Sequence, residues 1–177
     1  MKRNIYIVLS QTGTVFSRAL KFVTGAKYNH VSISLSPTLE KMYSFGRLNP
    51  YNPFIGGFVE EGKHKGTFQR FKNTEVMVLE LAVEEEKYAG IQSLINYFIQ
   101  KKTKFHYNYW GIVLACFKKN FAPSNRFYCS QFVRAVLAWL DIENACELPD
   151  IVRPIDFLKL TNKKIVYSGL LQKCDIK

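Results

Sequence analysis

A cysteine and a histidine, far apart in the sequence, are the residues of this chain best suited to do chemistry. Cys129 lies in the run RFYCSQFV at 126–133 and is expected in the first turn of a helix. Backbone N–H groups there lack helical partners and the helix dipole is positive, so both favour a thiolate. His30 opens a strand-like run and would supply the base that a thiol nucleophile needs. The pair therefore predicts a cysteine enzyme.

Cys129 also has an ordinary structural interpretation. It shares the apolar stripe of its helix, whose other members are Phe132, Val133, Val136, Leu137 and Leu140. Free cysteine is among the residue types most often buried, so an inert core thiol fits the same position. The residues around it, from 125 to 131, are mostly polar, which is unusual where a helix enters a core. This polarity favours the catalytic interpretation.

The strand of His30 alternates strictly between apolar and polar residues. In the run NHVSISLS at 29–36, Val31, Ile33 and Leu35 share one face, while His30 and three serines share the other. The imidazole is therefore expected to project away from the buried side, into a polar cleft or solvent. His64, between lysines in a loop, and His106, in an aromatic and basic segment, are weaker candidates.

Hydrophobic periodicity and turn residues predict a single α+β domain spanning residues 1–177, without repeats or an interdomain linker. The expected strands are 4–9, 30–36, 41–47, 75–82 and 165–168, and the expected helices are 14–25, 84–102, 107–117 and 129–140. The segment 48–72 contains prolines, glycines and a charged patch, so it is expected to be an elaborated loop or an irregular strand pair. Such a segment carries specificity on a rigid scaffold.

The chain is strongly basic, with 25 lysines and arginines against 14 acidic residues and a net charge of +11. Such a charge favours anionic partners such as phospholipid headgroups, nucleic acid or acidic cell-wall polymers. No signature of specific nucleic-acid recognition is found. The segment 104–114 combines aromatic residues with lysines, and it suits either an anionic interface or a core helix with a basic start.

No apolar run approaches the length needed to span a bilayer, and the N-terminus lacks the features of an export signal. The expected location is therefore cytoplasmic, with peripheral membrane association as a variant. The four cysteines are expected to be reduced. Their wide, irregular spacing argues against a zinc site, and neither a metal nor another cofactor is expected.

Two motifs resemble those of a known enzyme superfamily. The run NHVSISL at 29–35, followed by KMYSF at 41–45, resembles the histidine hairpin of NlpC-type papain-like amidases, and YCSQFV at 128–133 resembles their nucleophile helix. The cysteine follows the histidine here, an order similar to the circularly permuted branch that includes lecithin:retinol acyltransferase-like proteins and small bacterial relatives. The resemblance implies a permuted papain-like fold, with a small antiparallel sheet packed against helices and the cysteine at a helix N-terminus.

The resemblance implies roles for individual residues. Cys129 would be the nucleophile of a hydrolase or acyltransferase acting on an amide or ester, and His30 would be its general base. Counting along the hairpin brings Ser44 to the position that orients the imidazole, where the family usually has His, Asn, Gln or Glu; Glu40 is the substitute. Gln11 and Tyr128 would support the site, with Gln11 donating to the oxyanion. Peptides, cell-wall peptides and lipid esters all remain candidate substrates.

Two other functions compete with the enzyme. A degenerate papain-like module could bind a lipid, peptide or anionic polymer without catalysis, because a serine stabilises imidazolium less than a carboxylate does. Non-specific nucleic-acid binding rests on charge alone and would depend strongly on salt.

Overall fold

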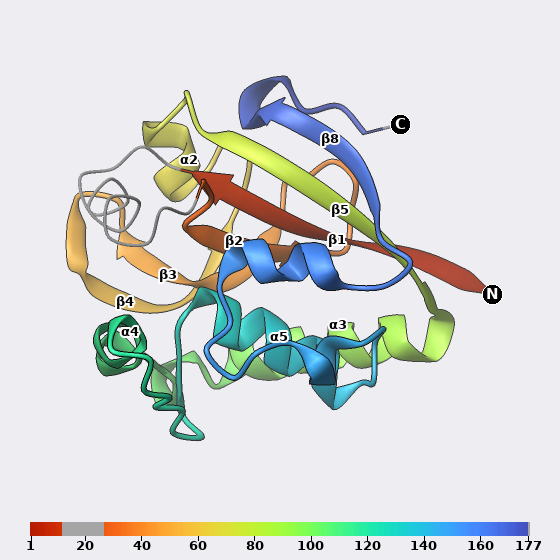
Figure 1. Ribbon diagram of the computed structural model, residues 1–177. Coiled ribbons are helices and arrows are strands. Elements are labelled where there is room, and N and C mark those ends of the chain that lie inside the picture. Colours follow the sequence, from red (N-terminus) through yellow and green to blue (C-terminus); the bar gives the residue numbers. More distant parts are fainter. Residues whose placement is uncertain (12–26, 177) are drawn as a thin grey trace.

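A computed structural model describes residues 1–11 and 27–176, and it is an α+β structure built on a six-stranded antiparallel sheet (Figure 1). The strand order is β4-β3-β2-β1-β5-β8. These strands are β1 (Lys2–Gln11), β2 (His30–Ser34), β3 (Met42–Asn49), β4 (Asn52–Glu61), β5 (Glu75–Glu84) and β8 (Lys164–Leu170). The predicted α+β class with an antiparallel sheet is confirmed, while the helix expected at 14–25 lies outside the described residues.

Four described α-helices accompany the sheet: α2 (Gly66–Arg70), α3 (Glu85–Gln100), α4 (Tyr109–Cys116) and α5 (Cys129–Trp139). Short 3-10 turns are η1 (Lys102–Lys104), η2 (Ala145–Glu147), η3 (Pro154–Lys159) and η4 (Leu171–Lys173). A separate parallel pair joins β6 (His106–Tyr107) to β7 (Arg126–Phe127). The segment 48–72 is more regular than expected, because it contains the ten-residue strand β4 and the helix α2.

The sheet is buried on both faces. Along β1, Ile5, Ile7 and Leu9 belong to the larger core, which α3 and α5 cover. Tyr6 and Val8 alternate with them and belong to a smaller core, which also contains Phe68 of α2 and Leu171 of η4. A strand covered on both sides reads as a nearly continuous apolar run, as the sequence of β1 does.

Five phenylalanines hold α3 and α5 against the sheet. Phe45 of β3 lies 5.4 Å from Phe132 of α5, and Phe98 of α3 lies 5.1 Å from Phe132, measured between ring centroids. Phe58 and Phe127 complete the cluster. Edge-to-face and tilted pairs of this kind add to the hydrophobic stabilisation from burial. The cluster fixes the first turns of α5 over the strands β2 and β3.

The serine face of β2 contradicts the sequence prediction. Ser32 and Ser34 are fully buried, because α2 and the C-terminal segment cover this side of the sheet. Ser34 Oγ donates to the carbonyl oxygens of Ser36 and Lys41, and these bonds satisfy the buried hydroxyl. Period-two alternation distinguishes the two faces of a strand, but it does not say that the polar face meets water.

Candidate active site

Cys129 is the first residue of α5, and the residue is 7% exposed. The preceding residue, Tyr128, is the N-cap, and its backbone N–H donates to Gln131 Oε1 at 3.2 Å. Asn108 Nδ2 donates to the same oxygen at 3.0 Å. The side chain of Gln131 therefore ties the start of α5 to the segment before α4. Cys129 is held at a helix terminus that has little freedom to fray.

Asn108 anchors this connection. Its Oδ1 caps α4 by accepting from the Gly111 N–H at 2.9 Å, and its Nδ2 also donates to the Phe121 carbonyl at 2.7 Å. A Cβ on Gly111 would lie 2.3 Å from that Nδ2, so only glycine fits there. The loop between α4 and α5 is thus locked to the helix that carries Cys129.

His30 is the first residue of β2, and its imidazole contacts a carboxylate that the sequence analysis did not identify. His30 Nε2 lies 2.9 Å and 3.1 Å from the two carboxylate oxygens of Glu61, the last residue of β4. Ser32 Oγ lies 3.3 Å from the same nitrogen and donates to Glu61 Oε2 at 2.7 Å. Glu61 is 4% exposed, so the ion pair is shielded from solvent.

The thiol lies on the other side of the imidazole. The side chains of Cys129 and His30 lie close enough together for each to shift the pKa of the other. Because Nε2 faces Glu61 and Ser32, Nδ1 is the ring nitrogen left for the thiol. The three groups form a chain in the order carboxylate, imidazole and thiol, which is the arrangement of an activated nucleophile, its base and the residue that orients the base.

The charges in this chain reinforce one another. Burial alone would lower the pKa of His30, but the negative charge of Glu61 and hydrogen bonds to Cys129 and Glu61 raise it to about 10. Burial raises the pKa of the Cys129 thiol, yet the hydrogen bond and charge of His30 outweigh it. A backbone hydrogen bond from Val31 acts in the same direction, and the pKa of Cys129 is lowered overall. The structure therefore favours a thiolate and imidazolium pair.

Ser44 does not occupy the orienting position that the resemblance implied. Its hydroxyl donates to the carbonyl oxygen of Val31 at 2.6 Å, whereas Glu61 contacts the imidazole. Ser44 instead joins β3 to β2 near the site. Glu40, the alternative orienting residue, is exposed at a turn. The carboxylate that contacts the imidazole belongs to Glu61 instead.

The other predicted site residues differ in how they are placed relative to Glu61, His30 and Cys129. Tyr128 is adjacent to Cys129, and burial is the main reason that its pKa is raised. Gln11 is the last residue of β1, next to Ser10, which pairs with His30. His64 and His106 are exposed and lie outside this group.

Tyr107 is a further residue of the site that the sequence analysis did not single out. Burial raises its pKa, and Cys129 and Tyr109 raise it further, so that it lies well above the ordinary value. The phenol therefore keeps its proton. Tyr107 pairs with Phe127, two residues before Cys129, and this pairing holds it near the start of α5. Because the paired strands are only two residues long, they leave no periodic pattern in the sequence.

Gly46 sits close against the site. A Cβ at this position would lie 3.3 Å from Glu61 Oε1 and 3.4 Å from His30 Cε1, closer than ordinary contacts. We expect Gly46→Ala to displace the ion pair by tenths of an ångström and to slow alkylation of Cys129 at pH 7 by roughly threefold to tenfold.

Gly57→Ala on β4 is the matched control, because the atoms nearest to its Cβ would belong to the exposed side chain of Leu48, at 3.3 Å. Peptide mapping after timed iodoacetamide treatment measures both rates, and circular dichroism checks the fold. Equal rates in the two variants would show that the close approach at Gly46 does not matter.

The described residues provide neither a metal cluster nor a membrane span. Within 1–11 and 27–176, no three His, Cys, Asp or Glu side chains gather so as to hold a metal ion. No helix in those ranges has the length and apolar character needed to cross a bilayer. No family model, curated protein or solved structure matches the chain.

Proposed function

We propose that the protein is a thiol hydrolase or acyltransferase that cleaves an amide or ester bond through a thioester on Cys129. The observation that carries this proposal is the buried chain of Glu61, His30 and Cys129. A buried ion pair is costly to desolvate, so its placement against a cysteine at a helix terminus suggests a catalytic purpose.

The same arrangement supports a permuted papain-like fold for this domain. The strand β2, which carries the histidine, precedes the cysteine helix α5 in the chain, and α5 packs against β2 and β3. The base and its carboxylate come from the sheet, while the nucleophile comes from the helix. This division matches the resemblance seen in the two sequence motifs.

In the acylation step, Cys129 Sγ attacks the substrate carbonyl carbon and forms a C–S bond while negative charge moves to the carbonyl oxygen. The backbone N–H of Cys129 and the side-chain amide of Gln11 would donate to that oxyanion. Collapse of the intermediate breaks the C–N or C–O bond. The leaving atom takes the proton from His30 Nδ1, and the acyl group remains on sulfur.

In the second step, His30 Nδ1 accepts a proton from water or from another acceptor hydroxyl or amine. The deprotonated acceptor attacks the thioester carbonyl, the C–S bond breaks, and the thiolate and imidazolium pair is restored. Glu61 holds the ring orientation through both steps and stabilises the imidazolium, without itself exchanging a proton with the substrate.

The alternative of a binding-only module rested on a serine in the orienting position and on the basic charge of the chain. Glu61 on the imidazole removes the first reason, and the charge is compatible with either function. The enzyme is therefore the function that the site favours.

Single-turnover acylation tests the proposal directly. We expect p-nitrophenyl esters of short and long acyl chains to add one acyl mass to the protein, located on Cys129 and removable with hydroxylamine. Cys129→Ala should abolish the adduct, and Cys146→Ala, at an exposed thiol, is the matched control. An adduct that persists in Cys129→Ala, or no adduct with any ester or peptide amide tested, would refute the proposal.

A further inference from the structure

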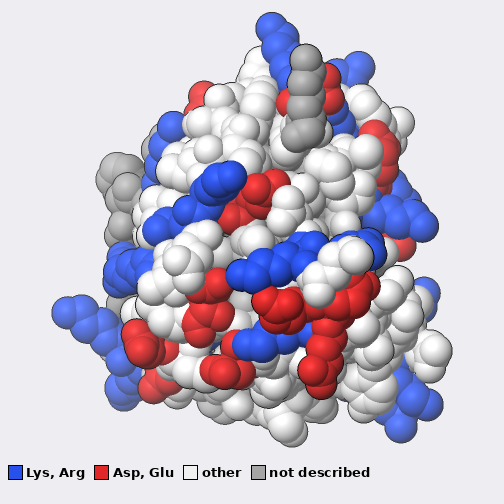
Figure 2. All heavy atoms as spheres, turned by 90° about the vertical axis from the view of Figure 1, so that its right-hand side faces the viewer, with Lys and Arg blue, Asp and Glu red and all other residues white. Residues whose placement is uncertain are grey.

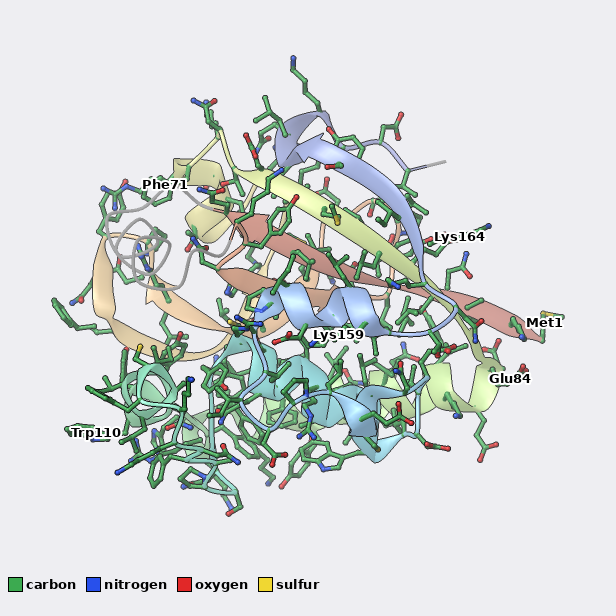
Figure 3. The ribbon with its side chains drawn as sticks, viewed as in Figure 1. Met1, Phe71, Glu84, Trp110, Lys159 and Lys164 are labelled. Carbon is green, nitrogen blue, oxygen red and sulfur yellow. The ribbon has the colours of Figure 1, made fainter. Side chains whose placement is uncertain are left out.

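The helix α4 is apolar on nearly all sides and yet lies at the surface. Its sequence is YWGIVLAC, and Gly111 alone is buried. Trp110 is 66% exposed, and Phe117, directly after the helix, is 71% exposed. Figure 3 shows Trp110 projecting outward at the edge of the molecule. A helix without a polar face is normally enclosed by protein or lipid, so this helix lacks its expected surroundings.

The tip of the β3–β4 hairpin extends the apolar surface. Phe54 is 84% exposed and Ile55 is 49% exposed. The next residue, Gly56, lies against Tyr109, the first residue of α4, because a Cβ on Gly56 would be 2.9 Å from the Tyr109 hydroxyl. The hairpin and α4 are therefore neighbours, as their positions in Figure 1 also show. We call the combined surface the α4 patch; it consists of Phe54, Ile55, Tyr109, Trp110, Val113 and Phe117.

The chain around α4 is exclusively basic. Residues 87–140 contain eight lysines and arginines and no aspartate or glutamate. Three of the lysines precede α4 at 101, 102 and 104, and Lys118 and Lys119 follow it. All five are exposed. The opposite side of the molecule, shown in Figure 2, instead mixes the two signs, as in the ion pair of Lys2 with Glu84.

We propose that the α4 patch docks the protein onto the surface of an anionic lipid bilayer. Trp110, Phe117 and Phe54 would enter the boundary between headgroups and acyl chains, and the flanking lysines would contact the lipid phosphates. Aromatic residues surrounded by lysines are suited to that boundary, because the rings can lie among the acyl chains while the ammonium groups stay at the level of the phosphates.

Charge argues against a second copy of the chain as the occupant. A symmetric dimer through the α4 patch would bring two sets of lysines together without acidic residues to pair them, and like charges across an interface are costly. A bilayer with anionic lipids supplies both the apolar phase and the opposite charge.

The docked orientation would bring the bilayer close to the candidate active site. The tilted rings of Tyr109, in the patch, and Tyr107 lie 4.7 Å apart between centroids, and Cys129 is close enough to Tyr107 to raise its pKa. The docking proposal itself does not rest on the proposed chemistry, because its test uses Cys129→Ala protein.

Vesicle flotation tests the proposal, with phosphatidylcholine vesicles compared with vesicles that also contain phosphatidylglycerol. We expect Cys129→Ala protein to float with the anionic vesicles and to be released by high salt. A further Trp110→Ser substitution should lower the partition coefficient by about tenfold or more. Ile165→Ser, at an exposed residue of β8, should leave it unchanged. Lys118→Gln with Lys119→Gln should weaken binding by about tenfold, whereas Lys163→Gln with Lys164→Gln should not.

The two tryptophans give an independent readout. Trp139→Phe leaves Trp110 as the only indole, and its emission should shift to the blue on anionic vesicles and be quenched by brominated lipid. Trp110→Phe leaves Trp139, on α5, which should show neither effect. Failure to float, equal binding by Trp110→Ser, or a dimer in sedimentation that Trp110→Ser dissociates would each overturn the proposal.

Discussion

Iodoacetamide will alkylate Cys129 at pH 6 faster than it alkylates the exposed thiols of Cys116 and Cys146. Access alone predicts the reverse order, since Cys129 is 7% exposed. The expected order follows from the lowered pKa of Cys129, because only the thiolate reacts. Below the pKa of a thiol, each unit by which that pKa is lowered increases the thiolate fraction about tenfold, and the lower nucleophilicity offsets part of this gain.

The pH profile is the decisive part of this measurement. The alkylation rate of Cys129 should level off below the pKa of about 8.5 found for an ordinary thiol. His30→Ala should remove the low-pH plateau, because burial then acts on the thiol without the opposing charge. Mass spectrometry of tryptic peptides follows all the cysteines in one sample. A Cys129 rate that rises only above pH 8 in the wild-type protein would contradict the thiolate and imidazolium pair.

Glu61→Gln will shift the same profile upward by about one to two pH units and slow alkylation of Cys129 at pH 7 by roughly tenfold or more. The sign follows from the causes of the His30 shift. Burial lowers the pKa of His30, and the charge of Glu61 is the largest influence that raises it to about 10. Without that charge the imidazole loses its proton at a lower pH, and the thiol loses the cation that lowers its own pKa.

Glu60→Gln provides the control for this substitution. Glu60 precedes Glu61 on β4, points to the opposite face of the strand, and forms an ion pair with Lys65 at 2.7 Å. It should leave the Cys129 profile unchanged. A direct measurement of the His30 pKa by NMR titration separates an electrostatic role of Glu61 from a merely structural one. If Glu61→Gln lowers the Cys129 rate without lowering the pKa of His30, the electrostatic role is wrong.

The sequence predicted the elements that carry the site better than the contacts within it. Strands near His30 and at 75–82 leave strong local patterns, because alternation and apolar runs are local properties. The expected strand 4–9 and helix 129–140 correspond to β1 and α5 within one or two residues at most ends. Both predictions, of the strand and of the helix, depend only on residues that are neighbours in the sequence.

Glu61 escaped prediction because its role depends on pairing between distant residues. It faces His30 only because β4 pairs with β3 so that Met42 lies opposite Glu61. The prolines and glycines of 48–72 made this segment look like an elaborated loop or an irregular strand pair, so the regular strand β4 was not predicted. Counting along the hairpin therefore assigned the orienting role to Ser44. The burial of Ser32 could not be predicted from the sequence either, because α2 and the C-terminal segment, which cover this face of β2, are distant from Ser32 in the chain.

Because the sheet is covered on both faces, the candidate site is intact only when both layers are folded. Cys129 belongs to the core beneath the helices, whereas Glu61 pairs with Met42 of the opposite core, and His30 at the end of β2 spans the boundary. The turn after Glu61 is tied to the C-terminus, where Gln172 donates to the Lys63 carbonyl at 2.6 Å. Detachment of either layer would separate the thiol from its charge partners, so a partly unfolded chain would carry an ordinary, unreactive cysteine.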